Sequence, residues 1–264
     1  MTDAELLKLN EEGLIPGPGE REGDFLKRVG EVRGIYDGGQ WISRWDWDGM
    51  EERVKELFDF RPKFLPAFYS NEGLRVWEGA ACWIEGRKVC GVQLREGLRK
   101  GSYLGLYERG EILAHEAVHA ARSGFEEQKC EEFFAYMTSE KRWRRVLGPI
   151  LQRPWEVWPL LLSLLAGIFV EVGFGVAAVW LGLGFWRLIG QHLRLRRYVK
   201  RALHLVRDAK KVRAILFRLT DEEVARFAGG EDILEYAQRQ KCLRWRVIRL
   251  AYLKGEDYGT ESGD

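Results

Sequence analysis

Cysteine and histidine are both scarce in this chain, with four of each among 264 residues. No two cysteines have the C-x-x-C spacing, so the sequence offers no cysteine-based metal site and no disulfide framework. We therefore expect free thiols in a reducing compartment. The first ten residues lack the basic start and apolar core of a cleavable leader, which favours a cytoplasmic N-terminus. The net charge is only +2, which excludes a uniformly basic or acidic protein.

Two of the four histidines lie in the motif His115-Glu116-Ala117-Val118-His119, an H-E-x-x-H pattern in a segment predicted to be helical. Residues four apart on an α-helix project from the same side, one turn along, so both imidazoles can reach one metal ion. Glu116 lies on that side too, where its carboxylate can face a water on the metal. The pattern is typical of a zinc site with two histidine ligands and a carboxylate base.

This helix is predicted over residues 109–123, with Gly110 near its start and Gly124 as a stop signal. One face carries the two histidines, the glutamate and Ile112. The other face is small and apolar, and consists of Leu113, Ala114, Ala117, Val118 and Ala121. Such a helix fits the floor of a metal cleft. The alternative is a pair of surface histidines beside a chance glutamate.

A catalytic zinc site usually has a third protein ligand, and the sequence downstream offers carboxylates rather than another histidine. Residues 125–145 are predicted to form a second helix, which a turn around Gly124 would fold back antiparallel to the first. Glu131 and Glu132 follow His119 by twelve and thirteen residues. Both are therefore candidates for the third ligand.

An H-E-x-x-H motif followed by a glutamate on the next helix resembles the gluzincin family of zinc metallopeptidases. The resemblance covers residues 115–140. In this family the third ligand often lies three residues before a small residue packed in the second helix, and Ala135 has that position after Glu132. The resemblance therefore implies Glu132 as the third ligand of one zinc ion, with Glu131 as the alternative. It also implies a compact, zincin-like domain that hydrolyses peptide or protein substrates.

The expected reaction is hydrolysis of a peptide bond by a zinc-activated water, with Glu116 as the general base. A donor for the oxyanion is also expected, and the candidates are Tyr136, Tyr103 and Tyr107. A catalytically inactive, membrane-anchored metal-binding scaffold is the alternative interpretation of the same residues.

Upstream of the motif, residues 80–84 and 89–94 are two runs rich in β-branched and aromatic side chains. Glu85-Gly86-Arg87 separates them, which predicts a β-hairpin. Zinc peptidases commonly align an extended substrate along a strand edge, so this hairpin is a candidate substrate rail. A plain structural sheet that caps the helices is an equally good interpretation.

The N-terminal region, residues 1–64, has 15 acidic and 10 basic side chains and a net charge of −5. Helices are expected at residues 4–12, 20–32 and 50–60. Asp48 and Glu51 predict a capping box at the start of the third helix. The apolar stripe of that helix consists of Met50, Val54, Leu57 and Phe58. We expect this region to pack on a metallopeptidase core formed by residues 65–150.

Residues 157–186 form an apolar run of thirty residues with a single ionisable group, Glu171. A run of this length predicts a membrane segment, placed within residues 151–190. One long helix would put Glu171 near the bilayer midplane, whereas a hairpin of two short helices would put it at the far turn among headgroups. Each arm of a hairpin is short for a full span, so local thinning and a re-entrant loop are alternatives, as is a buried soluble core.

Basic clusters on both sides of the apolar run favour the hairpin. They consist of Lys141, Arg142, Arg144, Arg145 and Arg153 before it, and of Arg187, Arg194, Arg196, Arg197, Lys200 and Arg201 after it. Basic residues favour the cytoplasmic side, so an even number of passes leaves the metal domain and the C-terminus in the cytoplasm. The inner membrane of a bacterium is the expected location. Trp155, Trp158 and Trp186 would then share one interface as an aromatic belt.

The C-terminal part divides into a basic helical cytoplasmic region, residues 191–254, and a disordered tail, residues 255–264. Residues 187–254 have 18 basic and 7 acidic side chains, a net charge of +11. Helices are expected at residues 187–218, from Thr220 to the stop at Gly229-Gly230, and at 231–254. After a membrane segment, a basic amphipathic helix lies most simply against anionic lipid headgroups. Nucleic acid is the rival partner, but no recognition motif supports it.

Together these features predict a mostly helical α+β protein. Its parts would be a small zincin-like catalytic domain with the motif helix, a glutamate helix and a short antiparallel hairpin, then a transmembrane helical hairpin, then the basic C-terminal helices.

Overall fold

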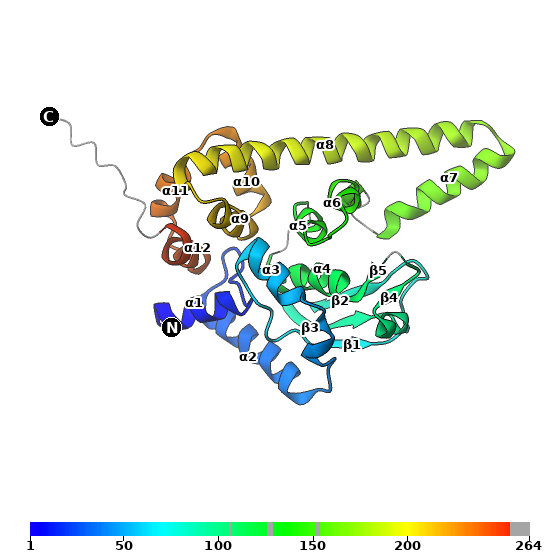
Figure 1. Ribbon diagram of the computed structural model, residues 1–264. Coiled ribbons are helices and arrows are strands. Elements are labelled where there is room, and N and C mark those ends of the chain that lie inside the picture. Colours follow the sequence, from blue (N-terminus) through cyan, green and yellow to red (C-terminus); the bar gives the residue numbers. More distant parts are fainter. Residues whose placement is uncertain (106, 126–128, 151–153, 254–264) are drawn as a thin grey trace.

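The computed structural model describes residues 1–105, 107–125, 129–150 and 154–253 (Figure 1). The chain is mostly helical, with a three-stranded sheet and a short two-stranded one, so the predicted mostly helical α+β class is confirmed at that level. The predicted disordered tail lies outside the described residues. Short 3-10 helices connect several elements, at Arg44–Trp47, Glu96–Lys100, Gly148–Ile150 and Pro154–Glu156.

The larger sheet contains the predicted hairpin. Its strands are β1 (Ala67–Tyr69), β2 (Ala80–Glu85) and β3 (Lys88–Leu94), in the order β1-β3-β2. β2 and β3 pair antiparallel around Gly86, whose φ of +60° suits glycine in a tight turn. β1 was not predicted, and it adds in parallel to the other side of β3. Among the described residues, β2 is therefore an edge strand. A second pair, β4 (Ser102–Tyr103) with β5 (Tyr107–Glu108), leads into the motif helix.

Three helices form the N-terminal part: α1 (Asp3–Glu11), α2 (Glu22–Gly38) and α3 (Met50–Phe58). α2 runs past its predicted end at residue 32. Met50, Val54 and Phe58 are buried, as their spacing on α3 predicts. The predicted capping box of this helix is wrong, because the residue that caps α3 is Gly49, in the left-handed region at φ +72°. Asp48 instead binds the guanidinium of Arg109, with an Oδ2–Nε distance of 2.8 Å.

The motif helix, α4 (Arg109–Ala121), is confirmed within two residues of its predicted end. The single helix predicted over residues 125–145 is wrong, since the structure has two short helices, α5 (Glu131–Met137) and α6 (Arg142–Leu147). Side-chain hydroxyls stabilise the break between them. Thr138 Oγ1 donates to the carbonyl of Ala135 at 2.6 Å, and Ser139 Oγ accepts from the N–H of Lys141 at 3.2 Å. Such local bonds compete with helix continuation.

The apolar run forms α7 (Val157–Phe169) and the first part of α8 (Val172–Val206), and the chain reverses between them at Val170 and Glu171 (Figure 1). The two helices approach closely where Gly173 faces Gly167, since a Cβ on Gly173 would lie 2.3 Å from the Gly167 nitrogen. One described helix, α8, is long and apolar enough to cross a membrane. α8 has 35 residues, so the boundary drawn at residue 190 falls inside a continuous helix.

The separate helix predicted over residues 187–218 is therefore wrong. Its first part belongs to α8, and its last part is α9 (Ala209–Phe217), which follows Arg207 in the left-handed conformation. α10 (Asp221–Gly229) is confirmed, with the capping box of Thr220 and Glu223 at its start. The predicted last helix is divided into α11 (Ile233–Arg239) and α12 (Leu243–Ile248), which a π-helix at Arg249–Leu253 extends.

The C-terminal helices share one hydrophobic core with the motif helix and the sheet. This core contains Phe58 of α3, Phe134 of α5, Phe217 of α9 and Trp245 of α12, each at most 1% exposed. Phe58 stacks on Phe217 with ring centroids 4.4 Å apart. Tyr198, on the second half of α8, is also buried in this core. The basic half of α8 is therefore partly a core helix.

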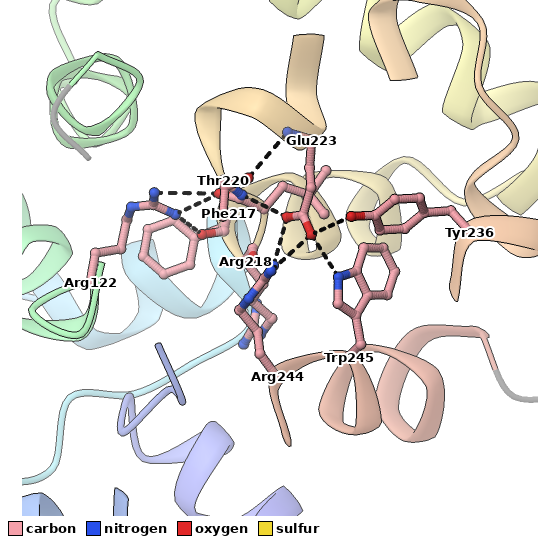
Figure 2. Close-up of polar contacts among 9 residues, drawn as sticks. Arg122, Phe217, Arg218, Thr220, Glu223, Tyr236, Arg244 and Trp245 are labelled. Carbon is pink, nitrogen blue, oxygen red and sulfur yellow. Dashed lines mark hydrogen bonds and ion pairs between the residues drawn. The ribbon is translucent and has the colours of Figure 1, made fainter. Parts of the chain in front are cut away.

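A buried polar network joins the end of α4 to the C-terminal helices (Figure 2). The guanidinium of Arg244 forms two hydrogen bonds of 2.8 Å with the carboxylate of Glu223. The indole N–H of Trp245 donates to the same carboxylate at 2.7 Å. On the other side, Arg122, which caps α4, donates to the carbonyls of Phe217 and Leu219. The motif helix is thus anchored at its C-terminal end by residues about a hundred positions further along the chain.

Candidate metal centre

The buried face of α4 fixes the direction of the motif side chains. Leu113, Ala114, Ala117 and Val118 are fully buried, so the helix packs closely into the core on the side predicted from the sequence. The opposite side presents both histidines and their glutamate toward α5. Glu116 is 8% exposed, whereas His115 and His119 are partly accessible. A small apolar face therefore lets a polar stripe lie deep in the molecule.

Three ligand atoms converge between α4 and α5. The Nε2 atoms of His115 and His119 are 3.3 Å apart. Glu132 places one carboxylate oxygen 3.8 Å from Nε2 of His115 and the other 3.6 Å from Nε2 of His119. Metal–ligand bonds of about 2.0–2.2 Å at tetrahedral angles separate ligand atoms by about 3.3–3.6 Å. Two imidazoles and one carboxylate in this arrangement therefore fit a zinc ion and leave its fourth position open.

Glu131 has a different position from its neighbour Glu132. Its Oε1 lies 2.6 Å from Nδ1 of His119, on the side of the imidazole that faces away from the convergence point. Adjacent residues on a helix point about 100° apart, so only one of the two can face the ligand atoms. Within the described part of the chain, the group with metal-binding geometry is His115, His119 and Glu132. Glu131 instead accepts a hydrogen bond from Nδ1–H of His119, so Nε2 is the nitrogen that is directed toward the convergence point.

The electrostatics of Glu116 suit a general base. Burial raises the pKa of its carboxyl to about 7, and the carboxylates of Glu132 and Glu131 act in the same direction. The charge of His119 and a hydrogen bond from the backbone of Cys82 oppose this rise. A carboxylate with a pKa near neutrality can both take up and release a proton at physiological pH.

The two histidines differ in their protonation. Burial lowers the pKa of His115 well below its ordinary value, and the charges of His119 and Arg144 lower it further. Burial also disfavours the charged form of His119, but the hydrogen bond to Glu131 and the charge of Glu132 outweigh it and raise the pKa to about 10. Without a metal, the imidazole of His119 is therefore doubly protonated and positively charged at neutral pH. A metal ion that binds Nε2 would displace the second proton.

Of the three tyrosines predicted as oxyanion donors, the structure brings only Tyr136 to the site. Its ring packs edge-on against the imidazole of His115, with centroids 4.9 Å apart. Burial raises the pKa of Tyr136, so its hydroxyl stays protonated and can donate. The hydroxyls of Tyr103 and Tyr107 donate instead to the carbonyls of Val76 and Trp77, at 3.3 and 3.0 Å.

The structure adds Arg144 and Cys82 to the surroundings of the site. Arg144 was predicted as part of a basic membrane flank, but it is buried and binds Glu111 of α4, with a nitrogen–oxygen distance of 2.5 Å. Its guanidinium also lies over the ring of Tyr136, 6.0 Å from the centroid. Burial raises the pKa of the Cys82 thiol well above its usual range, and Glu116 adds to the shift. No local spacing signals either residue, because the contacts join segments far apart in the sequence.

The edge strand β2 packs against α4. Cys82 of this strand is paired with Val92 of β3. One edge of β2 is therefore paired with β3, and its other edge is the outer edge of the sheet. A backbone hydrogen bond from Cys82 to Glu116 ties this strand to the predicted base. The predicted substrate rail therefore lies beside the metal centre. An extended peptide could pair with its open edge.

The helix that carries Glu132 also contacts α8 directly. The ring of His192 on α8 packs edge-on against Phe133, with centroids 4.9 Å apart. The Nε2 atom of His192 lies 3.1 Å from the carbonyl oxygen of Val146. Near the start of α7, the ring of Trp158 packs against Trp77, which lies just before β2, with centroids 5.7 Å apart. The elements around the candidate metal centre therefore pack directly against the base of the apolar helix pair.

Comparison of the chain with protein-family models, with curated proteins and with solved structures gave no match. The chemical interpretation of the site therefore depends on its own residues and geometry.

Proposed function

We propose that this chain is a membrane-anchored, zinc-dependent metallopeptidase of the gluzincin type. The observation that carries the proposal is the convergence of His115, His119 and Glu132, all within 4.8 Å of one another, beside the buried carboxylate of Glu116. Two imidazoles and a carboxylate are a donor set that suits zinc, and a fourth position left to water is typical of catalytic rather than structural sites.

His115, His119 and Glu132 would hold the ion. When bound, it would act as a Lewis acid on the scissile carbonyl and make water a better nucleophile near neutral pH. Glu116 takes a proton from the attacking water and passes it to the leaving amine, and its pKa of about 7 suits both steps. Tyr136, whose raised pKa keeps it protonated, donates a hydrogen bond to the oxygen that gains charge.

The substrate would bind as an extended strand along the open edge of β2. This places the scissile bond near Glu116, since that edge strand is hydrogen-bonded to it through Cys82. Main-chain pairing of this kind gives affinity without strong sequence preference. A peptide or protein that can present an unfolded segment is therefore the expected substrate.

The anchor in this proposal is α7 with the first half of α8. Their outer faces leave many large apolar side chains at least 40% exposed, among them Leu161, Leu162, Leu164, Leu165, Ile168, Phe169, Val172, Phe174, Val176, Val179 and Leu183. A water-soluble protein rarely exposes so large an apolar patch. α7 has 13 residues, or about 20 Å, which is shorter than a hydrocarbon core of about 30 Å. A short hairpin with both ends on the cytoplasmic side would bring Glu171 at its turn to the far headgroups only where the bilayer is locally thinned, and the proposal therefore includes such thinning.

The decisive experiment is metal analysis combined with a proteolysis assay on detergent-solubilised or reconstituted protein. We expect about one zinc ion per chain in the wild type, and loss of the ion in His115→Ala. Glu116→Gln should keep the ion and lose casein hydrolysis by several orders of magnitude, because it removes only the base.

Two results would contradict the proposal. One is folded wild-type protein without a stoichiometric transition metal. The other is a Glu116→Gln variant that still hydrolyses casein. Retention of zinc without any hydrolysis in the wild type would instead favour the inactive metal-binding scaffold.

A further inference from the structure

A cavity that is separate from the metal centre lies between α8 and the segment that begins α7. Its volume is about 670 Å³, within the range of small-molecule sites. In the part of the lining that the structure describes there are three basic side chains, Lys129, Arg187 and Arg194, and one acidic side chain, Glu156. Its position is the junction between the apolar and the basic halves of α8. The peptidase mechanism uses none of these residues.

One of the three basic side chains is part of the wall. Arg187 binds both carboxylate oxygens of Glu156 at 2.9 and 2.8 Å and the carbonyl of Ile150 at 2.8 Å. Its charge is therefore already neutralised. Among the described residues, neither the ammonium of Lys129 nor the guanidinium of Arg194 has an acidic partner. The described residues of the lining thus give a net positive charge, which Lys129 and Arg194 supply.

Aromatic side chains surround these charges. The rings of Trp155 and Trp180 pack against each other with centroids 6.1 Å apart, and the indole N–H of Trp180 donates to the carbonyl of Glu156 at 3.1 Å. Trp186 lies at the rim and is 81% exposed. Tryptophan concentrates at the level of lipid headgroups, where its ring meets the acyl boundary and its N–H meets polar groups.

An apolar track leads from the cavity toward the turn at Glu171. Leu183 lines the cavity, and Val179 and Val176 follow it at helical spacings of four and three residues on the same face of α8. All three are more than half exposed. A ligand that places an anion between Lys129 and Arg194 can therefore lay an alkyl chain along α8.

We propose that this cavity binds the phosphate of an anionic phospholipid, with an acyl chain along Leu183, Val179 and Val176. Basic pockets beside membrane helices on the cytoplasmic side are a known way to hold such headgroups. The site would fix the depth of the helix pair in the bilayer. The inference rests on the proposed membrane location but not on catalysis, so each can fail without the other.

The test is lipid binding to the full-length protein in phosphatidylcholine nanodiscs, followed by native mass spectrometry during titration with phosphatidylglycerol. We expect retention of phosphatidylglycerol over phosphatidylcholine. Lys129→Gln combined with Arg194→Gln should weaken binding about 30-fold, since each basic side chain near a membrane contributes about a fivefold factor. Arg196→Gln combined with Arg197→Gln is the matched control. It removes two exposed charges from α8 that do not line the cavity, and it should retain the lipid.

Three outcomes would overturn the proposal. Equal binding of phosphatidylcholine and phosphatidylglycerol would show that the cavity does not recognise the negative charge of the headgroup. An equal loss in both double variants would show general electrostatic attraction rather than a site. Competition by inorganic phosphate at the lipid's own concentration would show a free-phosphate site instead. Casein hydrolysis by each variant, measured alongside, reports separately on the metal centre.

Discussion

At the scale of single residues, the roles of Glu131 and Glu132 are set by their directions from a seven-residue helix. The sequence placed both carboxylates near the histidines, but only the resemblance to gluzincins favoured Glu132. The hydrogen bond from Nδ1 of His119 to Glu131 indicates a separate role for Glu131. It orients the imidazole and determines which nitrogen remains free for a metal.

This contact predicts a proton balance for metal binding. The pKa of His119 is raised to about 10, so the metal-free protein keeps that proton at pH 8 and must release it when zinc binds. Isothermal titration in buffers of different ionisation enthalpy should show about one proton released per ion at pH 8. Glu131→Gln removes the carboxylate charge that helps to raise this pKa, and it should reduce this number clearly below one. Glu140→Gln, which changes an exposed carboxylate paired with Arg53, should leave it unchanged. An identical proton count in Glu131→Gln would contradict the assigned role.

The raised pKa of Glu116 predicts a pH-dependent cost to the metal-free fold. Because burial raises the folded-state pKa to about 7 from an ordinary value near 4.5, ionisation of this group destabilises the fold as the pH rises through that window. In the presence of a chelator, Glu116→Gln should therefore be as stable as the wild type at pH 4.5. At pH 8 it should be more stable by roughly 3 kcal/mol. Thermal unfolding at both pH values measures the difference, and a difference independent of pH would refute the assignment.

At the scale of elements, the periodicity of apolar residues correctly predicted those helices and strands whose formation depends on residues within the same segment. The apolar face of α4 and the alternating strands around Gly86 were found because their periodicity is contained in the segment itself. The same reasoning failed over residues 125–145, where two hydroxyl side chains end α5 after seven residues. It also failed for Arg144, whose partner Glu111 lies 33 residues earlier. A sequence pattern has no means of showing such a distant contact.

The close packing of Tyr136 predicts a sensitive position in the segment after α6. A Cβ on Gly148 would lie 2.2 Å from the Tyr136 ring, so that ring or the backbone must shift. Gly148→Ala should destabilise the protein by about 1–3 kcal/mol and weaken zinc binding, because α5 carries both Tyr136 and Glu132. Gly30→Ala, in α2, is the control. It meets no atom within 4 Å and should be neutral or slightly stabilising. Equal behaviour of the two variants in thermal unfolding and zinc titration would contradict the packing argument.

At the scale of the whole molecule, the candidate metal centre and the apolar helix pair are joined by direct packing rather than by a linker. α5 rests on α8 through Phe133 and His192, and α8 ends in the core that also holds α4. The sequence separated these parts because composition changes sharply near residue 187, whereas the helix that crosses this change is continuous. Composition indicates whether a segment faces water or an apolar environment, but it does not show where a helix ends.

This arrangement predicts a preference for substrates held at the bilayer. A cleavable segment tethered to a lipid-anchored helix has a high effective concentration at a metal centre close to the membrane. In vesicles, cleavage should fall about 30-fold as a flexible spacer between anchor and cleavage site is lengthened from about 5 to about 50 residues. Hydrolysis of the same segment without an anchor serves as the control for active enzyme. A rate independent of anchor and spacer would rule out this preference while leaving the peptidase assignment intact.

The 35-residue continuity of α8 has a mechanical meaning. If lipid holds the apolar half of this helix, as proposed, the other half is already fixed in the core through Tyr198, and the continuous helix has no hinge between the two. The proposed catalytic site would then lie at a constant distance from the bilayer surface. Selection among targets would depend on how far each one's loose segment extends from the surface.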